Sequence, residues 1–365
     1  MTAGKTHLGR IQALRFFASF AVLFAHLQRE VGENLMPGVR FARFTLIDGG
    51  IGVDIFFVIS GFIMYYIAGD DFGGGARASL QFIRRRLMRV APLYFGATVL
   101  VLLVALTSGE VVASGPLTVV QTVASFLFIP WPNAFGQVVP ILKLGWALNL
   151  QVYFYVVFAI ALAWPRRTGL ALLCVILVLM MAAARMVSGV PLAVVFWGQG
   201  MVAEFLAGIA IAIAYRHGWR AGYWQGWLLV LGGLTLAAGL RASGLAGHVD
   251  RAVFAGIPAA LIFAGVAGQP SREAAGRWRG WLDRAQGRAG DASYALYLSH
   301  PFSIRAATLL WPRLGLPDAP WLFIVGVMLV AIAVSLAINR WIERPLDVWL
   351  RQWRAQTRVA ASART

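Results

Sequence analysis

Residues 14–26 read LRFFASFAVLFAH, an apolar run that carries Arg15 near one end and His26 at the other. Ionisable side chains are rare in membrane-spanning helices because their burial in lipid is costly. Apolar runs of this kind recur along all 365 residues, of which 59% are hydrophobic and only 13% are charged. A spanning helix needs about 20 mostly apolar residues, and soluble domains are about 25% charged. The sequence therefore predicts an all-α polytopic membrane protein.

We predict about ten spans in one transmembrane helical bundle. A further apolar segment, residues 117–129, is short for a bilayer of about 30 Å and is predicted to be a re-entrant or interfacial helix. The predicted spans are residues 11–28, 50–68, 91–106, 145–163, 169–185, 196–215, 225–240, 252–268, 293–311 and 320–340.

The arginines indicate how the bundle is oriented. With an even number of spans, one set of loops holds most of them, which is typical of the cytoplasmic side. The net charge of +17 is therefore better explained by topology than by nucleic-acid binding. Both termini are predicted to be cytoplasmic, with a transmembrane domain at residues 1–345 and a basic cytoplasmic tail at residues 346–365. The predicted cytoplasmic loops hold Arg77, Arg84, Arg85, Arg86, Arg89, Arg166, Arg167, Arg216, Arg220, Arg272, Arg277, Arg279, Arg284 and Arg288.

Several protein classes have no support in the sequence. The single cysteine, Cys174, lies in an apolar run, so no disulfide can form within the chain. Metal-ligand spacings, a Walker loop and a GxGxxG motif before a helix are all missing, so we expect no metal ion and no redox cofactor. The first apolar run lacks a small-residue cleavage site and is predicted to stay as a span.

Arg15 and His26 are predicted to share one face of the first span. They are eleven residues apart, which is about 1100° of helical rotation, close to three turns, and roughly 16 Å along the axis. The two side chains would then line a path from the cytoplasmic side toward the opposite side. In the alternative interpretation, Arg15 reaches the inner headgroups and His26 caps the end of the helix, where a cation is favourable.

Asp54 is a candidate partner for His26. It lies about one turn inside the second predicted span, in the stretch GGIGVDIFFVISGF. A short external loop joins the first two spans, so we expect Asp54 and His26 to meet at similar depth. A carboxylate there would orient the imidazole as a general base. The alternative is an aspartate that accepts hydrogen bonds from the loop backbone.

An arginine cluster precedes the third span in the stretch FIRRRLMRVAPLY, residues 82–94. Arg86 and Arg89 are three residues apart and Arg85 and Arg89 are four apart, so either pair shares a helix face. Guanidinium groups bind phosphates bidentately, so the cluster is a candidate phosphate site. Plain topology signalling is the alternative, since cytoplasmic charges belong here.

Three further sites are weaker. Glu204 lies in mid-membrane and is either functional or the partner of a buried arginine. His300 lies in mid-span, in SYALYLSHPF. Glu343 and Arg344, which precede Pro345, are predicted to form a structural ion pair.

Taken together, these stretches resemble the acyltransferase-3 family of integral membrane acyltransferases, most closely its bacterial branch that O-acetylates exopolysaccharides and lipopolysaccharides. Arg15 and His26 match the family's R-x10-H motif. The pair Arg86 and Arg89 matches its arginine motif, and GIGVDIFFVISGF resembles its second-span signature. The stretches WALNLQVYFY, SYALYLSHPF and ERPL resemble three later signatures.

The fourth-span stretch departs from the family pattern. Gln151 stands where the family has a glutamate, and Ala147 replaces a hydroxyl residue. Glutamine can form hydrogen bonds but cannot take a proton at neutral pH. A role that needs a carboxylate at this position is therefore not expected.

The resemblance implies an O-acyltransferase of the bacterial inner membrane. It would move an acetyl or short acyl group from cytoplasmic acetyl-CoA, its co-substrate, to a hydroxyl of an exopolysaccharide, a lipopolysaccharide or a lipid-linked precursor. Its expected partners are that glycan, membrane lipid and polysaccharide-assembly proteins, and not nucleic acid. An acyltransferase that acts on a small molecule at the inner face is the first alternative. A transporter is the second, although paired broken helices are not evident.

The resemblance also implies site residues. His26 would be catalytic, and Arg15 with the pair Arg86 and Arg89 would bind the donor or support catalysis. Together with the residue patterns above, the predicted catalytic residues are His26, Asp54 and Arg15, and the predicted donor-binding residues are Arg85, Arg86 and Arg89. His26 either deprotonates the acceptor hydroxyl or accepts the acetyl group transiently. The external segment 107–144 carries Trp131, Asn133 and Gln137, which modestly favours a glycan. The candidate substrate residues are Trp146, Asn149, Gln151, Glu204 and His300.

Overall fold

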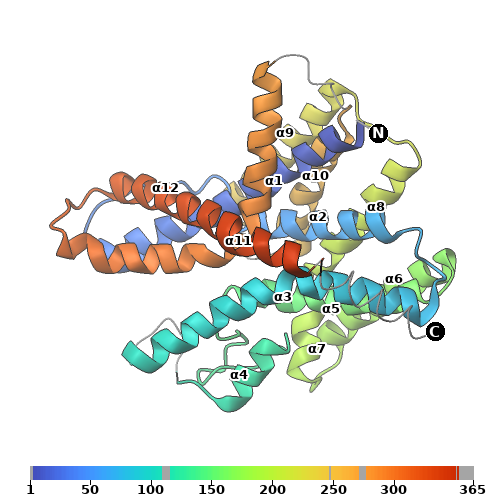
Figure 1. Cartoon of the computed structure of the whole chain (residues 1–365), viewed down its shortest axis with the longest axis horizontal. Helices are drawn as coiled ribbons and strands as arrows, with labels where there is room; N and C mark the ends of the chain where they lie inside the picture. Colours follow the sequence, from blue (N-terminus) through green and yellow to red (C-terminus); the bar gives the residue numbers. More distant parts are fainter. Residues whose placement is uncertain (1–2, 109–115, 246–247, 271–276, 351, 353–365) are drawn as a thin grey trace.

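The structure is a computed structural model that describes residues 3–108, 116–245, 248–270, 277–350 and 352. Helices make up 77% of it (Figure 1), which confirms the all-α prediction. The described residues contain no strand and only one isolated bridge, between Pro132 and Val138. The α-helices are α1 (Ala3–Glu30), α2 (Ile51–Ala68), α3 (Gly75–Ser108), α4 (Val119–Phe126), α5 (Gly145–Leu162), α6 (Arg166–Met186), α7 (Leu192–Trp197), α8 (Val202–Arg216), α9 (Tyr223–Ala242), α10 (Ile257–Gly268), α11 (Arg277–Arg313) and α12 (Pro320–Ile338). Short π-helical segments are η1 (Val31–Leu35), η3 (Ala252–Gly256) and η4 (Asn339–Glu343).

Seven helical segments of the described chain are long and apolar enough to cross a membrane, so a multi-span bundle is confirmed. The other three predicted spans, residues 196–215, 252–268 and 293–311, fall on α7–α8, η3–α10 and the second half of α11. These segments are not both long enough and apolar enough to count among the seven. The count of ten spans and the orientation of the termini therefore stay predictions. The seven are Gly9–Leu35, Ile51–Ala68, Gly75–Leu106, Gly145–Leu162, Arg166–Met186, Tyr223–Ala242 and Pro320–Leu350.

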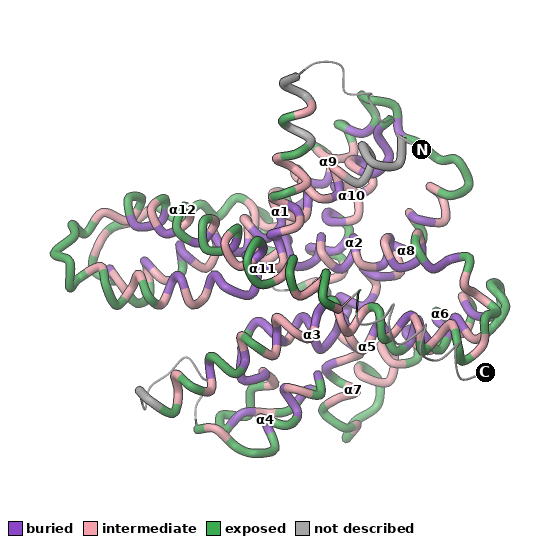
Figure 2. Tube along the Cα trace, in the orientation of Figure 1, coloured by how far each residue is buried: buried purple, intermediate pink, exposed green. Residues whose placement is uncertain are grey.

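Burial separates central from peripheral helices. In α2 and α5, 72% of the span is buried, whereas only 17% is buried in α6 and α9. Figure 2 accordingly colours most of α2 as buried. The peripheral helices are nonetheless apolar enough to cross a membrane, so their exposed faces suit lipid rather than water. Helix α2 packs against α8, α1 and α10, which makes it the centre of the bundle.

Glycines allow α2 to approach its neighbours closely. A Cβ atom added to Gly61 of α2 would lie 2.1 Å from the carbonyl oxygen of Phe205. A Cβ atom added to Gly208 of α8 would lie 2.1 Å from the carbonyl oxygen of Val58. Small residues in such pairs bring helix backbones together where lipid gives no hydrophobic drive for association. On the other side of α2, a Cβ atom added to Gly52 would lie 2.2 Å from the carbonyl oxygen of Ala18 in α1.

Helix α1 also packs against α11, and α11 lies beside α12 (Figure 1). The hydroxyl of Ser19 donates to the carbonyl of Ser293 at 2.8 Å. The ring of Phe24 stacks on Trp321 with centroids 6.3 Å apart. These contacts place the α1 face that carries the sequence motif between α2 and α11.

Two predicted segments have simple local structures. The predicted interfacial segment 117–129 contains the eight-residue helix α4, capped where Thr118 accepts a hydrogen bond from the backbone of Gln121. The predicted boundary after residue 345 falls within the helical segment Pro320–Leu350. Most of the predicted tail, residues 351 and 353–365, lies outside the described residues.

Candidate active site

A cavity of about 300 Å³ lies among α1, α2, α3, α5 and α11. This volume is at the lower end of the range for small-molecule sites. The lining is mostly apolar and aromatic, with a few polar groups, which is typical of such sites. The residues that line it are Ile11, Gln12, Arg15, Val53, Phe56, Phe57, Ile59, Ser60, Ile63, Met64, Ile67, Arg86, Arg89, Val90, Ala147, Leu148, Gln151, Tyr155, Tyr294 and Tyr297.

Three of the predicted arginines, Arg15 of α1 and Arg86 and Arg89 of α3, line this cavity together. No acidic residue is among the residues that line it. Arg15 donates to the side chain of Gln12 at 3.1 Å, and its charge repels that of Arg89. The cavity therefore concentrates positive charge beside apolar surface, an arrangement suited to an anionic ligand with an apolar portion.

Arg85 does not join this group. Its guanidinium forms an ion pair with Asp71 at 3.3 Å, and both side chains are exposed. Neighbouring residues on a helix point about 100° apart, so Arg85 and Arg86 face different surroundings. Of the three α3 arginines predicted to bind the donor, the structure thus places two, Arg86 and Arg89, in the cavity.

Polar groups of α5 and α2 complete the lining. Gln151 and Tyr155 are one turn apart on α5, and Ser60 lies across from them on α2. The Nε2 group of Gln151 is buried without a hydrogen-bond partner among the described residues. The predicted substrate residues Trp146 and Asn149 lie outside the lining; Trp146 packs edge-on against Phe57, 6.5 Å between centroids.

His26 pairs with His300 of α11. The Nδ1 atom of His26 lies 3.2 Å from the Nε2 atom of His300, and the rings meet edge to face. The Nδ1 atom of His300 lies 3.1 Å from the carbonyl oxygen of Leu296. His300, predicted to contact substrate, is fully buried and contacts His26 instead.

The two histidines do not line the cavity. Arg15 and His26 were predicted to line one path, but only Arg15 lines this cavity. Tyr297 connects the two regions. It lines the cavity, and its ring centroid lies 6.2 Å from that of His300. The histidine pair therefore lies directly beyond the aromatic part of the lining.

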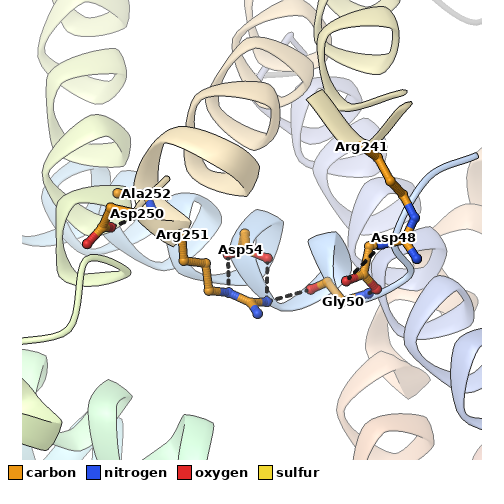
Figure 3. A network of polar contacts seen from close by, with 7 residues as sticks. All are labelled: Asp48, Gly50, Asp54, Arg241, Asp250, Arg251 and Ala252. Atoms are coloured by element: carbon orange, nitrogen blue, oxygen red, sulfur yellow. Dashed lines mark hydrogen bonds and ion pairs between the residues drawn. The ribbon is translucent and has the colours of Figure 1, made fainter. Parts of the chain in front are cut away.

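The predicted contact between Asp54 and His26 is wrong. Figure 3 shows that Asp54 instead binds Arg251, whose Nε and Nη2 atoms donate to the two carboxylate oxygens at 2.9 Å each. Gly52 faces α1, and Asp54 follows two residues later, about 200° around the helix. The carboxylate thus points away from α1, the helix that carries His26.

Glu204 lies beside this ion pair rather than in the cavity. Its carboxyl group is buried and close enough to Asp54 and Arg251 for their charges to interact. Both of its carboxyl oxygens are buried without a hydrogen-bond partner among the described residues, and Glu204 forms no ion pair with Arg251, so its interpretation as the partner of a buried arginine is not confirmed. Two exposed ion pairs flank the cluster, Arg241 with Asp48 and Arg185 with Asp250.

The predicted ion pair between Glu343 and Arg344 is also wrong. Arg344 pairs with Asp291 at 3.2 Å. Glu343 accepts a hydrogen bond from Asn339 at 2.9 Å. Side chains of adjacent residues on a helix point in different directions, so Glu343 and Arg344 each contact a different residue.

In the external segment, Trp131 is exposed, but the two amides have structural partners. The side chain of Asn133 donates to that of Gln137 at 3.2 Å and accepts from the backbone of Phe135. These bonds hold a turn in which Asn133 is buried, whereas Trp131 and Gln137 are exposed.

Sequence reasoning missed Arg251, Tyr155 and Tyr297. Arg251 directly precedes an apolar helix, and this position could have matched it to a buried acid. The tyrosines lie within the recognised stretches WALNLQVYFY and SYALYLSHPF. Their position four residues from Gln151 and three from His300 was the available signal.

Comparison with known proteins supports an acyl-transfer site. Residues 8–340 match the family model Acyl_transf_3, described as "Acyltransferase domain". The chain is 31% identical over 328 residues to the "Exopolysaccharide production protein ExoZ" of Rhizobium meliloti (strain 1021), covering 88% of this chain and 95% of that protein. It is 26% identical over 324 residues to the "Acyltransferase MdmB" of Streptomyces mycarofaciens, covering 82% and 79%. No solved structure matches the chain.

Proposed function

We propose, since the chain belongs to the Acyl_transf_3 family of acyltransferase domains, that it moves an acetyl or short acyl group from cytoplasmic acyl-CoA to a glycan hydroxyl. The acceptor would be an exopolysaccharide, a lipopolysaccharide or their lipid-linked precursor. The observation that carries this proposal is the cavity in which Arg15, Arg86 and Arg89 converge on an otherwise apolar lining.

The cavity has the chemistry that an acyl-CoA requires. Guanidinium groups bind phosphate oxygens in pairs of charge-assisted hydrogen bonds. Arg89 is exposed whereas Arg15 is partly buried, so the positive charge continues from the surface inward along the cavity. Phosphates would bind Arg86 and Arg89, and the flexible pantetheine arm would extend along the apolar surface of α2 past Arg15.

Chemistry would take place at His26. One nitrogen of its imidazole takes the proton from the acceptor hydroxyl as the oxygen attacks the thioester carbon. The carbon–sulfur bond breaks, and the departing thiolate receives that proton as free coenzyme A forms. The donor must reach beyond the lining for this step, past Tyr297, because His26 lies on the far side of that residue.

The relatives favour a glycan acceptor. The first relative is named for exopolysaccharide production, and the alignment covers 95% of it. The name of the second states only an acyltransferase. A small-molecule acceptor at the inner face therefore remains the alternative, and a transporter is disfavoured by the family match.

We place the enzyme in the bacterial inner membrane, with the arginine end of the cavity toward the cytoplasm. The concentration of arginines in the loops around α3 supports this orientation. Lipid and the machinery of polysaccharide assembly would be its neighbours there.

The test uses inside-out membrane vesicles from the producing strain, which expose the cytoplasmic face and contain the native acceptor. Radiolabelled acetyl-CoA is added, and label is measured in the polysaccharide fraction. His26→Ala should abolish transfer, whereas His217→Ala, an exposed histidine at the end of α8, should leave it unchanged. Transfer that persists in His26→Ala, or no label in glycan with the unmodified protein, would reject the proposal.

A further inference from the structure

His26 of α1 pairs with His300 of α11, and the scheme above gives His300 no role. His300 is fully buried, and no acidic side chain of the described residues hydrogen-bonds to either ring. An imidazolium buried without a counter-ion is costly, so the resting pair is neutral. In a neutral imidazole one nitrogen donates a hydrogen bond and the other accepts.

The backbone decides which nitrogen of His300 carries the proton. Its Nδ1 atom lies 3.1 Å from the carbonyl oxygen of Leu296, which can only accept. The carbonyl of Tyr297 also interacts with the ring, because Pro301 has no amide hydrogen to occupy it in the helix. Nδ1 of His300 is therefore the donor, and its Nε2 atom is left as an acceptor.

The same reasoning assigns which ring nitrogen of His26 carries the hydrogen. Its Nδ1 atom lies 3.2 Å from the accepting Nε2 atom of His300, so Nδ1 of His26 must carry the hydrogen. The Nε2 atom of His26 then keeps its lone pair. We propose that His300 is a positioning residue that holds His26 in the tautomer whose Nε2 atom can take the acceptor proton.

This inference rests on the proposed function, since it assigns a role through His26 in the same transfer. When Nε2 of His26 takes the proton, the ring becomes a cation and its bond from Nδ1 to His300 becomes charge-assisted. The leaving thiolate then removes the proton from Nε2, and both rings return to their resting tautomers. His300 gains no group and loses no proton overall.

The inference gives an order for three substitutions. His300→Leu fills the space but cannot accept from His26, and it should lower kcat by about 10- to 100-fold, by analogy with the loss of a hydrogen-bond partner of a metal-bound histidine. The KM for acetyl-CoA should not change, because His300 does not line the cavity. His300→Gln can place an amide oxygen near the position of Nε2 and should recover most of the lost kcat. Ser299→Ala, a buried neighbour in the same turn, should match the unmodified protein.

The experiment measures initial rates of label transfer from acetyl-CoA to glycan in the same inside-out vesicles, per amount of inserted protein. A kcat for His300→Leu within twofold of the unmodified value overturns the inference, as does an equal loss in His300→Leu and His300→Gln. Should His300→Leu fail to insert, His300→Gln is compared with His300→Asn, whose shorter amide keeps the bond to Leu296 but does not reach His26; equal rates then overturn the inference. Activity in His26→Ala would instead reject the proposed function.

Discussion

Removal of the Arg251 side chain should destabilise the bundle without changing its chemistry. The Asp54 carboxylate is fully buried, and Arg251 donates two hydrogen bonds to it. Hydrogen bonds to charged groups contribute about 1.5–3 kcal/mol each. Breaking a buried ion pair by removing one partner costs about 3–5 kcal/mol, because the remaining charge has no partner. Asp54 is fully buried but the Arg251 side chain is 39% exposed, so we expect Arg251→Met to lower the free energy of unfolding by about 3 kcal/mol, the lower end of that range.

The assay is unfolding by denaturant in mixed detergent micelles, with acetyl transfer measured on the folded fraction. Arg241→Met is the matched control, because Arg241 pairs with Asp48 at 3.8 Å and both side chains are exposed. Exposed pairs contribute about 0–1 kcal/mol. Asp54→Asn combined with Arg251→Met removes both charges and should be less destabilised than Arg251→Met alone.

Two results would refute this reasoning. A loss of less than about 1 kcal/mol in Arg251→Met, equal to that of the exposed control, would show that the buried pair does not stabilise the fold. A folded Arg251→Met protein that has lost acetyl transfer as completely as His26→Ala would restore Asp54 to the catalytic site.

Three further predictions follow from single contacts. Arg86→Ala should raise the KM for acetyl-CoA by about 10- to 100-fold through loss of charged hydrogen bonds, whereas Arg85→Ala, paired with Asp71 outside the cavity, should change it little, as measured by transfer kinetics in vesicles. Gly61→Ala should destabilise the protein by about 1–3 kcal/mol because its Cβ meets the Phe205 backbone, while Gly239→Ala in α9, with open space, should not; thermal unfolding in detergent compares them. A hydrogen bond from Arg216, aided by Arg166, holds the pKa of the exposed Asp70 below its usual 3.8. The ionised Asp70 therefore stabilises the fold at neutral pH, and this contribution is lost as the pH falls below 3.8. When the free energy of unfolding is measured against pH, the decrease in this acid range should be absent in Asp70→Asn.

The helical bundle and the arginine site were accessible from sequence. Spanning helices are set by the length of apolar runs, which is local information. Arg86 and Arg89 share a helix face because they are three residues apart, and the structure brings both to the cavity with Arg15. Spacing within one helix thus predicted which side chains point the same way.

Contacts between helices were not accessible in the same way. Asp54 and His26 were matched by depth, but a partner also depends on the rotation of each helix about its axis. That rotation is set here by Gly52 against Ala18 on one side of α2 and by Gly61 against Phe205 on the other. Without a known packing partner for these glycines, the sequence cannot tell that Asp54 faces Arg251.

The cavity contains three guanidinium groups and no carboxylate among the residues that line it. Each guanidinium is ionised at any physiological pH. Such a surface enriches small anions from the surrounding solution. A donor must displace these ions to enter, so its apparent affinity will depend on the identity of the background salt. Phosphate or sulfate in a purification buffer would compete for the same guanidinium groups, whereas a larger, weakly hydrogen-bonding anion would not.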